Sequence, residues 1–443
     1  MKKFFRTILP LSLFAMTLAS CGESAVTDTA TDQGGSADSS VPAPTHDYDL
    51  KIWAAENAKA LTEKQAKRWA DAVKASDGVD IGITVEAVGE GDAAGNMTTD
   101  PESGADLYCF AQDQLSRLKN AGALQTIIDA QAKADLIANN DEQSVSAVTV
   151  GDSIVAYPLT SDNGFFMYYD KSVFPDESKL ANMEDIIEVC REAGKKIYFQ
   201  LTTSAWYSAS YFMAFDCFST WSTNKQGQFY DYSDNYNSKA GEKALKAAYN
   251  LLKEKTIFVN NASASTGFTA DKDGVRSAAV VISGTWDYAA AVAALGDNLG
   301  ARELPSVTIN GETKHLASFM GCKLMGVKPQ TDSTKGIYAE VLAEYLTGEE
   351  CQLERFNELG WGPSNRNAQQ NENVKTNIAL NALSAQNEHA VAQGQYPGDW
   401  WTSAAAIFEN LEASDGSDAS IKAILTKYES TVDTYINGLP DEA

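Results

Sequence analysis

The sequence predicts an α/β protein built on a mainly parallel sheet. In two stretches, residues 50–85 and 105–122, short apolar runs alternate with a segment of helical periodicity. Alternation of strands with helices is typical of parallel sheets whose helices make the connections. The chain has 443 residues, which is long enough for two or three domains with substantial cores.

The first 21 residues have the composition of a secretory signal peptide. Three basic residues come first, residues 8–18 are largely apolar, and small residues then lead to Cys21. The stretch is shorter than a membrane-spanning helix, and no later window offers the roughly 20 apolar residues that such a helix needs. We therefore expect residues 1–21 to be removed on secretion, and an ordinary signal with an incidental cysteine stays open as an alternative.

Residues 22–46 are rich in Ser, Thr, Ala, Asp, Gly and Pro, and large apolar side chains are almost missing. Such a segment buries too little apolar surface to offset the entropy lost on folding. We expect a flexible tether, which would let a folded body stand off a membrane.

The charge of the chain disfavours several partners. The sequence carries 60 acidic and 35 basic residues, a formal net charge of −25. Removal of a segment with three basic residues makes the mature chain more acidic still. Because such a surface repels polyanions, we expect no nucleic-acid partner and no direct adhesion to anionic lipid headgroups.

The cysteines and histidines predict neither a metal site nor a catalytic triad. After Cys21 the five cysteines are scattered without a C-x-x-C pair, which favours buried small side chains over a disulfide framework or a metal site. The three histidines, His46, His315 and His389, lie far apart without zinc-ligand spacing. We expect no metal and no cofactor.

The amino-terminal elements are predicted in order as follows. An apolar run at residues 50–54 predicts a strand, and the sequence from Thr62 to Gln65 has the pattern of a capping box that would start the next helix. Gly78 would end that helix before a strand at residues 81–85. Residues 105–111 predict another strand, followed by a helix that Gly122 ends.

Later segments repeat these patterns. Residues 153–170 are extended and dense in aromatics, and we interpret them as a crossing between two parts of the molecule. The remaining expected elements are helices at residues 183–193, 240–253, 336–346 and 349–359, strands at 196–200 and 278–283, a turn at 271–274, and a last helix with Ile421, Ile424, Leu425, Tyr428, Val432 and Tyr435 on one face.

Several aromatic side chains favour a carbohydrate ligand. A pyranose has apolar C–H faces and a rim of hydroxyls, so its site needs flat aromatics for stacking together with carboxylates or amides. The aromatics in segments that we interpret as loops, where an α/β sheet binds its ligand, are Trp206, Tyr207, Trp286, Trp361, Trp400 and Trp401. For each of them a lid on a local apolar cluster is the alternative, and Trp221 is assigned to such a cluster.

Five segments, taken in order, resemble a known family. They are residues 104–124 (GADLYCFAQDQLSRLKNAGAL), 157–170 (YPLTSDNGFFMYYD), 281–288 (VISGTWDY), 345–356 (YLTGEECQLERF) and 398–403 (GDWWTS). Together they are similar to the extracellular solute-binding proteins of ABC importers, specifically the maltose- and maltodextrin-binding family. Residues 18–22 (LASCG) likewise resemble the lipobox of bacterial lipoproteins, which implies a lipid, with palmitate among its acyl chains, on Cys21 and an anchor on the extracytoplasmic face of the cell membrane.

The resemblance implies a two-lobe periplasmic-binding-protein fold of class II, with a hinge and the ligand cleft between discontinuous lobes. The expected first lobe comprises residues 47–160 and 308–360, and the second comprises residues 161–307 and 361–443. The implied partners are an oligosaccharide and the permease subunits of an ABC transporter, and the implied state is a monomer.

The resemblance also implies site residues by position. Trp286, the aromatic of the Trp206-Tyr207 pair and one of Trp400 and Trp401 match the sugar-stacking aromatics of the family. Hydroxyl-binding acids of the family are matched by Asp113 and Asp162, and a polar pair after the first strand by Glu56 or Asn57. Gln114 stands where the maltose binders have a basic residue, and Phe110 replaces a tryptophan, so the linkage or chain length preferred here is open.

These observations predict a non-catalytic binding protein for an oligosaccharide, with malto-oligosaccharide first. Another oligosaccharide or polar solute stays open as an alternative, because the same residue types would bind it. A secreted carbohydrate-active hydrolase is the rival from another class, since two carboxylates at the right separation suffice for glycoside hydrolysis. The S-x-x-K spacing at residues 222–225 lacks the further motifs of its enzyme class.

Overall fold

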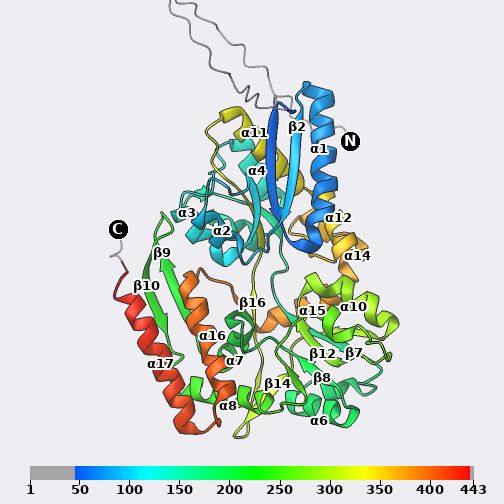
Figure 1. The fold of residues 1–443 in the computed structure, drawn as a ribbon, viewed down its shortest axis with the longest axis vertical. Helices are drawn as coiled ribbons and strands as arrows, with labels where there is room; N and C mark the ends of the chain where they lie inside the picture. The colour runs from blue at the N-terminus through cyan, green and yellow to red at the C-terminus, as the bar shows by residue number, and fades with distance from the viewer. Residues whose placement is uncertain (1–44, 440–443) are drawn as a thin grey trace, which may run out of the picture. The chain divides into compact units, whose positions relative to one another are not determined.

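The computed structural model of the protein describes residues 45–439 (Figure 1). The expected signal segment with Cys21, and all but the last two residues of the expected tether, lie outside the described residues. In the described part of the chain, no helix combines the length and apolar composition needed to cross a membrane.

The first sheet has five strands in the order β2-β1-β3-β17-β6. Its strands are β1 (Tyr48–Ala54), β2 (Ile81–Ala87), β3 (Leu107–Ala111), β6 (Tyr157–Thr160) and β17 (Lys323–Val327). β1 runs parallel to β2 and β3, with Ile52 opposite both Val85 and Leu107. β17 comes from a distant part of the chain and runs antiparallel to β3 and β6.

Helices surround this sheet in the upper part of Figure 1. They are α1 (Lys59–Asp77), α2 (Ala93–Thr99), α3 (Leu115–Asn120), α4 (Ala130–Asn139), α5 (Glu142–Ala147), α11 (Ser333–Leu346) and α12 (Glu349–Leu359), with the hairpin β4 (Thr149–Val150) and β5 (Ser153–Ile154). The predicted capping box is wrong, because α1 begins at Lys59. Inside the helix, the Thr62 hydroxyl donates to the carbonyl of Ala58 at 2.9 Å.

The second sheet also has five strands, in the order β11-β8-β12-β7-β13. They are β7 (Phe166–Asp170), β8 (Lys196–Tyr198), β11 (Phe258–Val259), β12 (Ala278–Ser283) and β13 (Leu299–Arg302). β8 is parallel to β11 and β12, whereas β7 is antiparallel to β12 and β13. Both sheets are therefore mixed and the prediction of a mainly parallel sheet is wrong, because strands returning from distant segments enter each sheet in the opposite direction.

Most of the remaining elements belong to the lower part of Figure 1. The helices are α6 (Met183–Ala193), α7 (Ala205–Ala214), α8 (Lys239–Leu252), α9 (Ala264–Phe268), α10 (Tyr288–Leu295), α13 (Arg366–Gln369), α14 (Glu372–Lys375), α15 (Ile378–Gln386), α16 (Gly398–Ala413) and α17 (Asp418–Ile436). The short strand pairs are β9 (Ser219–Thr223) with β10 (Phe229–Asp234), β14 (Ser306–Ile309) with β15 (Glu312–His315), and β16 (Ser318–Met320) with β18 (Ala390–Ala392).

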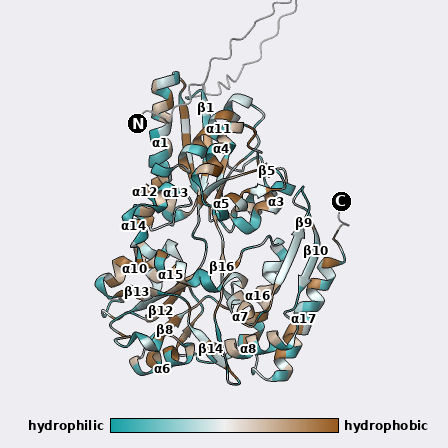
Figure 2. Ribbon diagram, turned by 180° about the vertical axis from the view of Figure 1, so that it is seen from behind, coloured by the Kyte–Doolittle hydropathy of each residue, from teal (hydrophilic) through white to brown (hydrophobic). Residues whose placement is uncertain are grey.

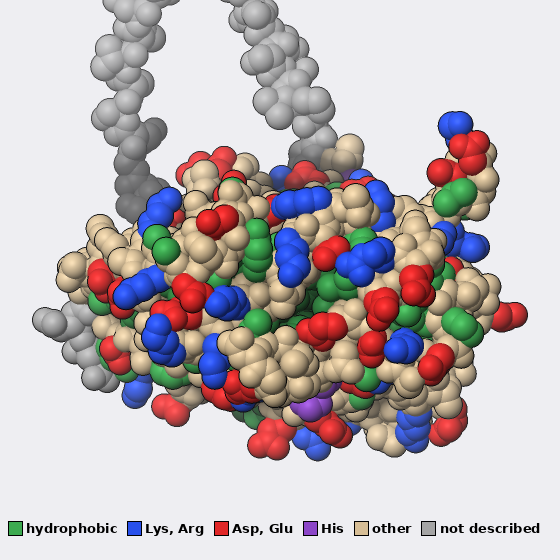
Figure 3. Space-filling view, turned by 90° about the horizontal axis from the view of Figure 1, so that it is seen from below, with side chains coloured by type: hydrophobic (Ala, Val, Ile, Leu, Met, Phe, Trp, Pro, Cys, Tyr) green, Lys and Arg blue, Asp and Glu red, His purple; other side chains and the backbone are tan. Residues whose placement is uncertain are grey.

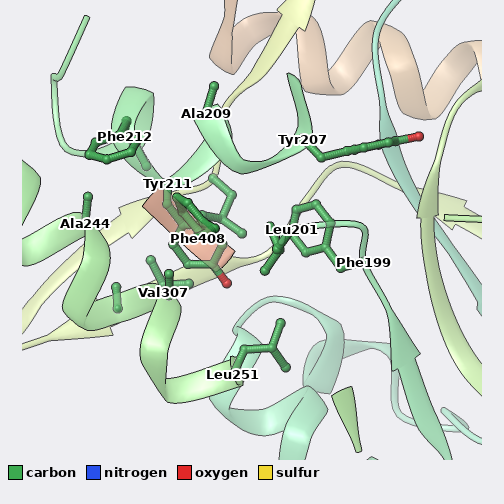
Figure 4. Packing of buried hydrophobic residues seen from close by; sticks show 14 of the residues in the cluster. Phe199, Leu201, Tyr207, Ala209, Tyr211, Phe212, Ala244, Leu251, Val307 and Phe408 are labelled. Carbon is green, nitrogen blue, oxygen red and sulfur yellow. The ribbon is translucent and has the colours of Figure 1, made fainter. Parts of the chain in front are cut away.

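Hydrophobic residues are concentrated in the strands, and helices such as α1 and α17 alternate hydrophobic with hydrophilic residues (Figure 2). The largest cluster joins the second sheet to α7, α8, α16 and α17, and within it Phe408 contacts both Tyr211 and Phe212 (Figure 4). On the face of the molecule seen in Figure 3, acidic and basic side chains are interspersed. Of the predicted face of the last helix, Ile421, Leu425, Tyr428 and Val432 are buried.

The residue boundaries of the two lobes stay a prediction, and the packing clusters bear on them. Val307 and Leu316 pack in the cluster of the second sheet, although the expected first lobe resumes at residue 308. Trp361 packs in the cluster of the first sheet, although the expected second lobe resumes there. Judged by its packing, the later segment that belongs to the first sheet begins near Gly321 and ends at Ser364. The hydroxyl of Ser364 donates a hydrogen bond to Asn140 at 2.9 Å.

Candidate ligand-binding site

The candidate site lies where strands of both sheets end. β1 and β3 of the first sheet lead into the short 3-10 turns Glu56–Ala58 and Gln112–Gln114, and β12 of the second sheet leads into a third, Thr285–Asp287. The side-chain amide of Asn57 donates to the carbonyl of Trp286 at 3.4 Å, which joins the ends of β1 and β12. Glu56 beside it is exposed. These turns place Asn57, Asp113 and Trp286 at the carboxyl ends of strands, where open α/β sheets bind ligands.

Asp113 is a buried carboxyl, 6% exposed, at the end of β3. Its Oδ1 accepts a hydrogen bond from Nε2 of Gln393 at 2.9 Å. Burial raises the pKa of Asp113 to about 7, and a hydrogen bond from the Trp401 side chain offsets part of this rise. At neutral pH the group therefore exists in both forms, and it can accept or donate hydrogen bonds to a polar ligand.

Asp162 joins three distant segments. Its Oδ2 accepts hydrogen bonds from the hydroxyl of Thr285 and, at 2.5 Å, from the backbone N–H of Gly362. The residue is 1% exposed, and its Oδ1 is buried with no hydrogen-bond partner among the described residues. Asp162 thus ties the turn after β12 to the segment between β6 and β7 and to the segment after α12.

Trp206 and Trp286 contact each other and are half-buried. Their ring centroids are 5.9 Å apart, and Trp206 also lies 4.7 Å from Phe165 and stacks on Phe319 at 6.5 Å. Tyr207 is buried beside them, 5.0 Å from Trp206. The predicted loop position of these residues is wrong: Trp206 and Tyr207 occupy the first turn of α7, and Trp286 occupies a 3-10 turn.

Trp400 and Trp401 have different surroundings, although both lie in the first turn of α16 rather than in a loop. Trp400 is 2% exposed, and its Nε1 donates to the hydroxyl of Tyr428 at 3.0 Å within the core. Trp401 is half-buried and lies 6.1 Å from Phe319, on the side of Asp113.

Trp361 is buried under a lysine that sequence reasoning missed. The Nζ of Lys323 lies 3.9 Å from the ring centroid of Trp361 and 5.0 Å from that of Trp286. Lys323 is the first residue of β17 and is 4% exposed. Two cation–π contacts hold its charge, and among the described residues no carboxylate pairs with it.

Gln393 is the second residue that was missed. Besides its bond to Asp113, its Oε1 accepts from Nε1 of Trp206 at 3.3 Å and from Asn163 at 3.4 Å. It therefore connects a buried acid of the first sheet with an aromatic of the second. The role of Gln393 could not be predicted from the sequence, because an isolated glutamine in a polar stretch is common. Lys323 could have been suspected, because a lysine inside an apolar run such as residues 319–327 is unusual.

Gln114 does not face the site. Its Nε2 donates to the carbonyls of Glu90 and Gly91 at 3.0 and 2.8 Å, and its Oε1 accepts from the backbone N–H of Ala94 at 3.0 Å. The residue therefore shapes the loop after β2.

The described cysteines are free and buried, namely Cys109, Cys190, Cys217, Cys322 and Cys351. Burial raises the pKa of each of these thiols. Residues 45–439 contain no group of three or more side chains arranged to hold a metal ion.

Comparison with known proteins gives consistent results. The family described as bacterial extracellular solute-binding protein matches residues 68–382, more than half of the chain. No curated protein matches the chain.

Among solved structures, the maltose/maltodextrin-binding domain of Bdellovibrio bacteriovorus bound to maltotriose has a TM-score of 0.72 at 17% identity, covering 88% of this chain and 100% of its own. The maltodextrin-binding protein MalE1 of L. casei BL23 has a TM-score of 0.66 at 19% identity, with 88% and 98% covered. A chain solved with acarbose has a TM-score of 0.72 at 24% identity, with 87% and 99% covered. These similarities confirm the predicted α/β fold of two-lobe binding proteins.

Proposed function

Because the chain belongs to the family of bacterial extracellular solute-binding proteins, whose members are binding proteins and not enzymes, we propose that it captures an oligosaccharide, with malto-oligosaccharide first. The observation that carries this proposal is the contact between Trp286 and Trp206, together with the hydrogen bonds by which Gln393 links Trp206 to the buried carboxyl of Asp113. Indole faces and a carboxyl group suit the C–H faces and hydroxyls of a sugar. Structural neighbours solved with maltotriose and acarbose support the same ligand class.

Within the candidate site we assign stacking to Trp286, Trp206 and Trp401, because all three rings are half-buried. Trp286 and Trp206 contact each other, and the side chain of Trp401 donates a hydrogen bond to Asp113. Asp113 and Asn57 supply hydrogen bonds to hydroxyls. Tyr207 packs against Trp206, and Trp400 packs against Trp401 from the core. The ammonium of Lys323 lies between Trp361 and Trp286, and Asp162 accepts a hydrogen bond from Thr285 in the turn of Trp286. Glu56 is exposed beside Asn57 and would contact the rim of a longer sugar.

We further propose that a lipid on Cys21 anchors the protein to the outer face of the cell membrane and that the protein delivers its sugar, as a monomer, to the permease of an ABC transporter. A sugar bridging both sheets would stabilise one relative arrangement of the two lobes, which the permease would recognise. Metabolic labelling with a palmitate analogue tests the anchor, because labelling should be lost in Cys21→Ala.

The decisive experiment is calorimetric titration of the purified protein with maltose, maltotriose and longer malto-oligosaccharides, followed by β-linked gluco-, xylo- and manno-oligosaccharides. Saturable binding without shortened sugars is expected for the malto-oligosaccharides. Binding to a β-linked series alone would replace the ligand class, and shortened products would overturn the assignment as a binding protein.

Trp286→Ala is expected to lower sugar affinity by about 10- to 100-fold, because a stacked aromatic contributes about 1–3 kcal/mol. Trp221→Ala is the matched control, since this tryptophan packs against Tyr232 of the β9–β10 hairpin, away from the candidate site. An equal loss of affinity in both variants would show a general effect on folding and contradict the assignment.

A further inference from the structure

Gly284 is the buried residue between strand β12 and the 3-10 turn that carries Trp286. The Trp286 side chain folds back over it. A Cβ at position 284 would lie 2.2 Å from both Cζ3 and Cη2 of the Trp286 ring and 2.6 Å from its Cε3. These distances are far shorter than van der Waals contact, so a side chain at position 284 and the present position of the ring exclude each other.

The backbone of Gly284 does not itself require glycine. Its φ of −120° and ψ of −168° are extended, and residues with a Cβ adopt this conformation as well. The left-handed region, in which glycine is favoured, is not used here. The closeness of the Trp286 ring, and not the backbone, is therefore the reason why position 284 cannot carry a side chain.

Hydrogen bonds fix the peptide of Gly284 at the end of the strand. Its carbonyl accepts from the hydroxyl of Tyr168 at 3.1 Å and from the backbone N–H of Asp287 at 3.1 Å. Tyr168 is fully buried in β7, the antiparallel neighbour of β12. A movement of the strand end away from the ring would break these hydrogen bonds inside the core, which is costly.

The two residues after Gly284 are fixed as well. The hydroxyl of Thr285 donates to Asp162, and the carbonyl of Trp286 accepts from the side-chain amide of Asn57 at 3.4 Å. Because the backbone is held on both sides, a Cβ at position 284 would be accommodated by rotation of the Trp286 side chain into another rotamer.

The present rotamer gives Trp286 its contacts in the candidate site. The centroid of its ring lies 5.0 Å from Nζ of Lys323 and 5.9 Å from the ring centroid of Trp206. We propose that Gly284 is a positioning residue for ligand binding, which by lacking a side chain leaves the space that the Trp286 ring needs in order to stack on the sugar. This inference rests on the proposed function, in which Trp286 is a stacking residue.

A double-mutant cycle of Gly284→Ala and Trp286→Ala, titrated with maltotriose, tests the proposal. Gly284→Ala alone should lower the affinity about tenfold or more. In the Trp286→Ala background the same change should alter the affinity less than about twofold, because the ring through which Gly284 acts is missing. An unchanged affinity in Gly284→Ala, or an equal loss in both backgrounds, would overturn the proposal.

Gly336→Ala is the matched control. Gly336 is also buried, in α11, but a Cβ there would make an ordinary contact, 3.6 Å from Gln330. The affinity for maltotriose should be unchanged in this variant. A loss equal to that in Gly284→Ala would mean that any added methyl group in the core weakens binding, and it would overturn the proposal.

If Gly284→Ala does not fold, thermal unfolding of the same variants provides the test. The double variant should fold with the Tm of Trp286→Ala to within about 2 °C, because the ring that the Cβ would meet is absent. A double variant that does not fold, although Trp286→Ala does, would show that Gly284 is required for other reasons and would overturn the proposal.

The position of the ring can also be measured without sugar, by fluorine NMR of the protein labelled with fluorotryptophan. Of the eight tryptophans, Trp286 is identified by the resonance that Trp286→Ala lacks. Gly284→Ala should shift this resonance and Gly336→Ala should not, and an unshifted resonance in Gly284→Ala would overturn the proposal. A shifted resonance, with no sugar bound by the unmodified protein, would support the role of Gly284 in placing the ring and contradict the proposed function alone.

Discussion

Substitution of Lys323 should affect the stability of the protein and its sugar affinity in opposite directions. A buried ammonium group without a carboxylate partner costs free energy, which two indole rings offset only in part. In Lys323→Met we expect the free energy of unfolding to stay equal or rise, while sugar affinity falls about tenfold because the ammonium group no longer holds the ring of Trp286 in place.

Chemical denaturation and calorimetric titration measure these two quantities separately. Lys253→Met, which removes an exposed lysine at the end of α8, should change neither. A variant of Lys323 that is less stable and binds sugar normally would show that the lysine is structural.

Asp113 should make stability depend on pH. Its pKa is raised by burial to about 7 in the folded protein, above the value in an unfolded chain, so folding favours the protonated form. Its contribution is therefore fully present below about pH 4 and is lost as the pH rises to 7, by as much as about 4 kcal/mol. Asp113→Asn should remove this dependence.

Urea unfolding of both proteins at pH 5 and pH 8 tests the sign. The free energy of unfolding of Asp113→Asn relative to the unmodified protein should be several kcal/mol more favourable at pH 8 than at pH 5. A difference that is the same at both pH values would contradict the raised pKa.

The residue types of the candidate site could be predicted from the sequence better than the secondary structure in which they lie. Trp286 and Asp113 were expected near a ligand and lie at strand ends, whereas Trp206, expected with them, lies in the first turn of α7. Their helical turns were not foreseen, because short turns after a strand lack the periodicity by which helices are predicted. Lys323 and Gln393 were missed because each acts through a partner more than 30 residues away in the sequence.

At the scale of single elements, Gly78 ends α1 in the left-handed region, with φ of 72°. A Cβ at this position would meet no atom within 4 Å, so the cost of Gly78→Ala is that of the backbone alone. We expect a loss of about 1 kcal/mol in the free energy of unfolding.

Gly95 offers a matched control. It lies inside α2, and a Cβ there also meets nothing within 4 Å. Gly95→Ala should therefore stabilise the protein by up to about 1 kcal/mol. Denaturant unfolding of the two variants should shift in opposite directions, and shifts of the same sign would contradict the backbone argument.

Local periodicity predicted several elements well. The bounds of α6 and α12 match the expected helices, and Gly78 ends its helix as predicted. β17 was missed, although it is an inner strand of the first sheet, because its partners β3 and β6 lie more than 160 residues earlier. Strand direction depends on such pairings, which explains why mixed sheets could not be distinguished from parallel ones.

At the scale of the whole molecule, the link from Thr285 to Asp162 connects the second sheet to the segment that follows the first. Thr285 is fully buried, and its hydroxyl donates to a carboxylate. Thr285→Val keeps the shape and removes the donor, so the free energy of unfolding should fall by about 1.5–3 kcal/mol.

Thr308→Val serves as the control, because the hydroxyl of Thr308 contacts only Thr313 at 3.0 Å in an exposed hairpin. Denaturant unfolding should show a change within about 0.5 kcal/mol for this variant. Equal losses in both variants would mean that the link to Asp162 adds nothing.

The buried thiols have a practical consequence for reporting ligand binding by fluorescence. The five described cysteines are buried, and their raised pKa values keep them protonated and unreactive toward alkylating dyes at neutral pH. In a protein without residues 1–44, which include Cys21, a single cysteine introduced at an exposed position near the site, such as Glu56→Cys, could then be labelled selectively without removing any of the five. A dye at that position would convert the protein into an optical sensor for its own ligand.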